Sequence, residues 1–178
     1  MLLPKLRYLL PACFLAAVTA GCASNIPELI RMGPPTKLEI SDARLNPKAL
    51  KGSRVRWGGN VVAVENFKTY TLLEILGRPL SDNGKPDESA KSMGRFMARV
   101  PGFLDPEEHP KGRLLSVTGK LSTPIEKRIG EYLYDYPVVD AEARYLWPKE
   151  EVYPYPYYRD PFYYPWYPYG YWHPYYRW

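Results

Sequence analysis

Residues 53–66 read SRVRWGGNVVAVEN, and this stretch decides the fold class. Up to Trp57, apolar residues alternate with arginines, which predicts a strand with one face toward a core and one toward solvent. The double glycine Gly58–Gly59 then changes the parity of the alternation, which continues through Val62 and Val64. Two glycines at a change of parity predict a bulge or a sharp bend in a long strand.

Four more strand patterns follow, separated by connectors rich in proline, glycine, aspartate and serine. They cover residues 69–76, 94–100, 113–121 and 131–147. Pro137 predicts an edge or a break within the last of them. Before the first strand, residues 40–52 are expected to hold a short helical turn that begins near Asn46.

Five strands without alternating amphipathic helices indicate a mainly β domain and argue against a parallel α/β fold. A bent strand among five short ones favours a small antiparallel OB-like Greek-key barrel. A two-sheet β-sandwich is the alternative. We expect residues 40–150 to form this domain.

The amino-terminal residues have the pattern of a secretory signal peptide. Lys5 and Arg7 precede a short apolar run at 9–18, and the small residues of TAGC follow at 19–22. The apolar run is too short to span a bilayer, which takes about 20 residues. We therefore predict a signal peptide over residues 1–21 and a flexible linker over residues 22–39.

The two cysteines of the chain, Cys13 and Cys22, both lie in this amino-terminal region. A domain without cysteines cannot be held by internal disulfides, so its stability must come from its own core.

TAGC resembles the bacterial lipobox, although Thr19 departs from the leucine preferred there. The resemblance implies cleavage between Gly21 and Cys22, acylation of Cys22 with fatty acids such as palmitate, and attachment to membrane lipid. Ala23 stands where an aspartate would imply retention in the inner membrane, so the resemblance favours the outer membrane. The alternative is an ordinary signal peptide that happens to end near a cysteine.

Further motifs resemble the Slp family, among them WGG at 57–59, GRFMARVPGFLDP at 94–106 and LWP at 146–148. These are outer-membrane lipoproteins of Gram-negative bacteria associated with starvation or stationary phase. The resemblance covers roughly residues 22–148 and leaves out the tyrosine-rich tail. It implies no catalytic residues.

The sequence contains none of the common nucleotide-binding, zinc-protease or nucleophile motifs. An acidic segment with one histidine, LDPEEHP at 104–110, fits a solvated turn better than a metal site. We therefore expect no enzymatic activity, no cofactor and no metal ion. Glu74, within an apolar strand, is expected on the outer face of that strand.

A set of basic residues on the predicted strands forms one candidate binding face. Its members are Arg54, Arg56, Arg95, Arg99 and Arg113, with Trp57 beside them. Phosphorylated lipid headgroups are the favoured anionic partner, because an exported protein rarely meets nucleic acid and a net charge of +5 is modest. The alternative is that these arginines only keep the strands soluble.

The tail at 151–178 is rich in tyrosine, tryptophan and proline, and its proline content predicts an extended, disordered chain. Three interpretations of the tail remain open. It is a disordered extension without a specific partner, a segment whose aromatic rings lie at the membrane interface, or a segment whose rings stack on the sugars of lipopolysaccharide or peptidoglycan. Tyr163, Trp166 and Trp172 are the candidate residues.

Two functional hypotheses follow. The first is a non-enzymatic outer-membrane lipoprotein that faces the periplasm and has an envelope-structural or stress-related role. The alternative is a module that binds an envelope glycan or lipid through the tail or the basic face.

Overall fold

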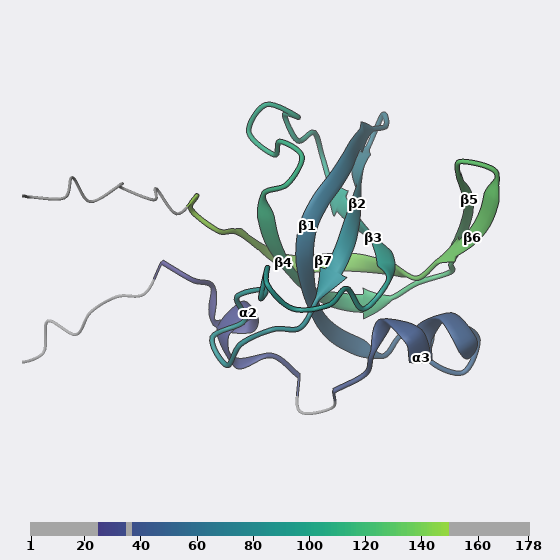
Figure 1. The fold of residues 1–178 in the computed structure, drawn as a ribbon, viewed down its shortest axis with the longest axis horizontal. Coiled ribbons are helices and arrows are strands. Elements are labelled where there is room, and N and C mark those ends of the chain that lie inside the picture. The colour runs from purple at the N-terminus through teal and green to yellow at the C-terminus, as the bar shows by residue number, and fades with distance from the viewer. Residues whose placement is uncertain (1–24, 35–36, 150–178) are drawn as a thin grey trace, which may run out of the picture.

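The computed structural model describes residues 25–34 and 37–149. Two short helices precede seven strands in this part of the chain (Figure 1). The elements are α2 (Glu28–Met32), α3 (Ile40–Leu45), β1 (Arg54–Asn66), β2 (Tyr70–Arg78), β3 (Arg95–Pro101), β4 (Leu114–Leu121), β5 (Ile125–Ile129), β6 (Tyr132–Tyr136) and β7 (Val138–Leu146). None of the described helices is long and apolar enough to cross a membrane.

Five strands form a closed barrel in the order β1-β2-β3-β7-β4, with β4 pairing back to β1. This confirms the five-stranded OB-like barrel and rules out the sandwich. The expectation of an entirely antiparallel barrel was wrong, because β7 runs parallel to β3. A closed ring with an odd number of strands cannot alternate in direction all the way round, so at least one neighbouring pair must be parallel.

The pattern predicted as one strand at 131–147 forms two. Pro137 separates β6 from β7, as expected of a break, and its carbonyl accepts a hydrogen bond from the Met97 amide at 2.8 Å. The connector before β6 contains β5, which the sequence analysis did not predict. It pairs with β6 as a separate two-stranded hairpin outside the barrel.

The parity change in β1 lies further along the strand than the sequence predicts. The register with β2 shifts between Val61 and Ala63, whereas Gly58–Gly59 pairs regularly with both neighbouring strands. Instead, the glycines allow the backbones of neighbouring strands to approach closely. A Cβ on Gly59 would lie 1.9 Å from the Leu76 carbonyl oxygen, so this position has no room for a side chain.

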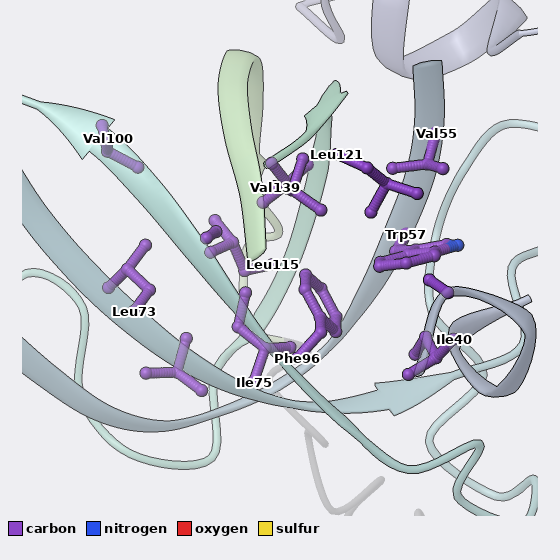
Figure 2. Packing of buried hydrophobic residues seen from close by; sticks show 14 of the residues in the cluster. Ile40, Val55, Trp57, Leu73, Ile75, Phe96, Val100, Leu115, Leu121 and Val139 are labelled. Atoms are coloured by element: carbon purple, nitrogen blue, oxygen red, sulfur yellow. The ribbon is translucent and has the colours of Figure 1, made fainter. Parts of the chain in front are cut away.

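The barrel interior is filled by the residues whose alternation predicted the strands. Trp57 packs edge-on against Phe96 with ring centroids 5.3 Å apart, and Ile40 of α3 lies beside them (Figure 2). The Trp57 indole N–H donates to the Leu38 carbonyl at 2.7 Å. The helical turn expected to begin near Asn46 instead ends there, because α3 spans Ile40–Leu45.

The segment expected to be a flexible linker contributes to the folded domain. Ile30 of α2 is fully buried, and α2 packs against β4 and β7. The Arg56 guanidinium donates from Nη1 to the carbonyls of Ile30 at 2.9 Å and Arg31 at 2.8 Å. The described domain therefore begins before Ile40, the boundary that the sequence suggested.

Candidate functional site

The outer face of β2 and β3 is where OB barrels bind oligonucleotides and oligosaccharides. Here the hairpin β5–β6 covers that face. An apolar cluster separate from the barrel core lies between them, with Leu72, Met97 and Val138 from barrel strands and Tyr136 from the hairpin. This covered surface is therefore part of the protein's packing.

A buried polar group lies under the hairpin. Arg95 Nη1 donates to Glu74 Oε1 at 2.5 Å, and the Tyr136 hydroxyl donates to the same oxygen at 2.9 Å. Burial, together with the hydrogen bond to the Glu74 carboxylate, raises the pKa of Tyr136 to about 12. Glu74 lies on the outer side of its strand, as predicted, but the hairpin leaves it only 8% exposed. The three groups satisfy one another, which is the arrangement of a structural contact.

The structure does not bring the predicted basic residues together as a free cationic face. Arg54 pairs with Glu142 at 2.7 Å, and Arg99 pairs with Asp140 at 2.9 Å. Arg56 holds α2, and Trp57 lies in the core at 5% exposure. Cys22, Gly21, Tyr163, Trp166 and Trp172 lie outside the described residues.

A groove with a volume of about 1000 Å³ lies where three segments distant in sequence meet. They are residues 81–89 between β2 and β3, residues 110–114 before and at the start of β4, and residues 147–149 after β7. Lys111 and Lys149 are exposed on its walls, and Arg113 and Trp147 line it as well. The last described residue, Lys149, thus lies at the groove.

The position of Trp147 in the groove is set by hydrogen bonds. Its indole N–H donates to Ser116 Oγ at 2.8 Å, and that hydroxyl donates to the Gly84 carbonyl at 2.6 Å. Arg113 Nη2 donates to the Trp147 carbonyl at 2.8 Å, whereas Arg113 Nε is buried and has no hydrogen-bond partner among the residues that the structure describes. A buried N–H without a partner costs free energy.

Within residues 25–34 and 37–149, no three histidine, cysteine, aspartate or glutamate side chains are grouped as metal ligands would be. In the acidic segment, the Asp105 carboxylate accepts from the Glu107 amide at 2.9 Å, as in a turn. His109 Nδ1 lies 3.1 Å from the Asp105 carbonyl oxygen.

Comparison with known proteins places the chain among bacterial outer membrane lipoproteins. It belongs to the outer membrane lipoprotein Slp family, whose family model matches residues 19–176. The match extends beyond Pro148, where the motif resemblance ended, and it includes most of the aromatic tail. The expectation that the tail lies outside the family pattern was therefore wrong.

Curated relatives agree with this assignment. The outer membrane protein Slp of Escherichia coli is 31% identical over 153 residues, which are 85% of this chain and 76% of the relative. The uncharacterized lipoprotein YeaY of Escherichia coli is 32% identical over 133 residues, 74% of this chain and 68% of the relative. An uncharacterized protein of Haemophilus influenzae is 35% identical over 103 residues, 57% of this chain and 56% of the relative. No solved structure matches the chain significantly.

Proposed function

We propose that this outer-membrane lipoprotein is anchored through an acylated Cys22, faces the periplasm, and has a non-enzymatic role in supporting the envelope under stress. The observation that carries the anchor is the start of the family match at residue 19, so TAGC lies within the family pattern. The barrel supports a non-enzymatic role, because its buried acid Glu74 is held by Arg95 and Tyr136 in a structural contact.

Cys22→Ala is expected to move the protein from the outer-membrane fraction to the soluble periplasm, because the substitution removes the acylated thiol. The measurement is cell fractionation with mass spectrometry of the amino-terminal peptide, which should carry fatty acid only in the wild type. Cys13→Ala is the matched control, since Cys13 lies in the predicted signal peptide, and it should leave fractionation unchanged. A Cys22→Ala protein that stayed in the outer-membrane fraction after removal of its signal peptide would refute the anchor.

The groove supports a second candidate function, the binding of an envelope glycan or lipid. Among the charged residues that line the groove, the bases Lys85, Lys111, Arg113 and Lys149 outnumber the acids Asp87 and Glu88, which favours an anionic partner such as the phosphates of lipopolysaccharide. Peptidoglycan is the alternative partner, because the aromatic rings of the tail could stack on its sugars. This groove replaces the basic face of β1 and β3, whose arginines have other partners.

The double variant Lys111→Glu/Lys149→Glu should reduce co-sedimentation with lipopolysaccharide vesicles about tenfold, because two attractive charges become repulsive. Lys48→Glu/Lys120→Glu is the matched control, since both lysines are exposed, neither lines the groove, and the change in charge is the same. Purified peptidoglycan sacculi run in parallel show which polymer binds. An equal loss in both double variants would mean attraction by net charge alone and would exclude the groove as the site.

A further inference from the structure

We propose that the outward side of α2 lies in the headgroup region of the membrane that carries Cys22, so that the barrel rests against the bilayer in one orientation. The contact consists of Leu29 and Met32, with a phospholipid surface as its partner. The proposal rests on acylation of Cys22 and goes beyond it, because an acylated cysteine on a flexible linker would leave the domain free to tumble.

The first argument is the length of chain between the lipid and the domain. The described structure begins at Asn25, three residues after Cys22, and Ile26 is already half-buried. Four residues span at most about 14 Å when fully extended. A domain of this size has a diameter of roughly 30 Å or more. The connection is therefore shorter than the domain is wide, and the barrel cannot stand far from the membrane.

The second argument is that α2 is fixed to the barrel. Beyond the two hydrogen bonds from Arg56, the connection between β2 and β3 packs closely on the helix. A Cβ on Gly84 would lie 2.5 Å from the Ile30 carbonyl oxygen, and one on Gly33 would lie 2.6 Å from Arg56 Nε. Since backbone meets backbone at Gly84 and Ile30, and the Arg56 side chain of β1 holds two carbonyls of α2, orienting α2 orients the whole domain.

The third argument is the chemistry of the side of α2 that the barrel leaves uncovered. Leu29 is 47% exposed and Met32 is 69% exposed, and residues three apart in a helix share a face. Arg31 is also exposed and can bind lipid phosphates. Glu28, at the start of the helix, is an exposed acid that would lie at the edge of the contact with the membrane. Two exposed apolar side chains on one face, with a cation on the adjoining side of the helix, suit the boundary between headgroups and acyl chains.

Both ends of the described chain lie on one side of the molecule, and the β1–β2 turn lies at the other end of the barrel from α2 (Figure 1). The Gly102 amide donates to the Thr69 carbonyl at 3.0 Å, which places the loop with Phe103 beside that turn. Phe103 is 70% exposed, almost the same as Met32. In the proposed orientation Met32 meets the bilayer and Phe103 points away from it.

The test compares a fluorescent probe at these two matched positions. Met32→Cys and Phe103→Cys are each made in the full acylated protein and labelled with an environment-sensitive dye. Cys13 is lost with the signal peptide and Cys22 is blocked by its acyl chain, so each protein has one reactive thiol. The proteins are reconstituted in phosphatidylethanolamine–phosphatidylglycerol vesicles that contain spin-labelled lipid.

We expect quenching by spin-labelled lipid to be at least about threefold stronger at position 32 than at position 103, with a blue-shifted emission only at position 32. Adding Leu29→Glu to the Met32→Cys protein should weaken that quenching. Equal quenching at both positions in proteins that float with the vesicles would overturn the orientation while leaving the anchor intact. Proteins that fail to float and take up dye at Cys22 would overturn acylation, and the orientation with it.

Discussion

Gly59→Ala is expected to lower the free energy of unfolding by about 3 kcal/mol, at the upper end of the usual cost of overpacking. The new methyl group would lie 1.9 Å from the Leu76 carbonyl oxygen and 2.7 Å from its carbon. Both are backbone atoms of the neighbouring strand, so no side chain can rotate away. Relief requires β1 and β2 to separate where Gly59 pairs with Gly77, which weakens the barrel at a central pair.

Urea unfolding of the mature chain, followed by tryptophan fluorescence, measures this loss, with Cys22→Ala as the common soluble background. Gly130→Ala is the control, because the added Cβ meets nothing within 4 Å and only the positive φ of 61° is unfavourable. That strain costs about 1 kcal/mol. If both substitutions cost the same, the close approach of β1 to β2 would not be what requires glycine at position 59.

Most of the fold prediction came from the alternation of apolar and polar residues, which located the strands. In residues 94–100 and 113–121 the alternating apolar residues all face inward, since Phe96, Ala98 and Val100 lie in the core with Leu115 and Val117. This works because the side-chain period of a strand is two and the barrel has one interior. The same rule could not reveal that Ser116 and Thr118 on the other face are also buried, since the segments packed on β4, which include α2 and the loop at Gly84, come from elsewhere in the chain.

Two elements were missed for physical reasons that their sequences show. β5 reads IEKRI, in which only two apolar residues face the barrel, and it is stable because the outer apolar cluster forms beneath the hairpin. α2 has five residues between Pro27 and Gly33, too short to be stable as an isolated helix. Its stability comes from burial of Ile30 and from Arg56, which lies 26 residues further along the chain.

The candidate site was less accessible to sequence analysis than the fold. Arg113 was among the predicted basic residues, but the groove also needs residues 81–89 and 147–149, which no local pattern links to it. The predicted face failed because the arginines alternate along strands whose neighbours supply acids and carbonyls as partners. Such cross-strand partners depend on register, which follows from the closed barrel and not from the spacing within one strand.

Arg95→Met is expected to lower the free energy of unfolding by about 3 kcal/mol, because it leaves the Glu74 carboxylate under the hairpin without its cation. The side chains of Arg95 and Glu74 are 30% and 9% exposed, so the acid is the member that water cannot reach after the change. The Tyr136 hydroxyl remains as a donor, but one neutral hydrogen bond does not replace the ion pair. Urea unfolding at neutral pH measures the loss.

Two companion variants separate the buried charge from packing. Tyr136→Phe keeps the ion pair and removes one hydrogen bond to a charged group, so it should cost less, about 2 kcal/mol. Glu74→Leu/Arg95→Met removes both charges, and it should recover most of the stability that Arg95→Met loses, because an apolar pair can replace a buried ion pair at little cost. A double variant no more stable than Arg95→Met would mean that the aliphatic part of Arg95, and not its charge, holds the hairpin against β2 and β3.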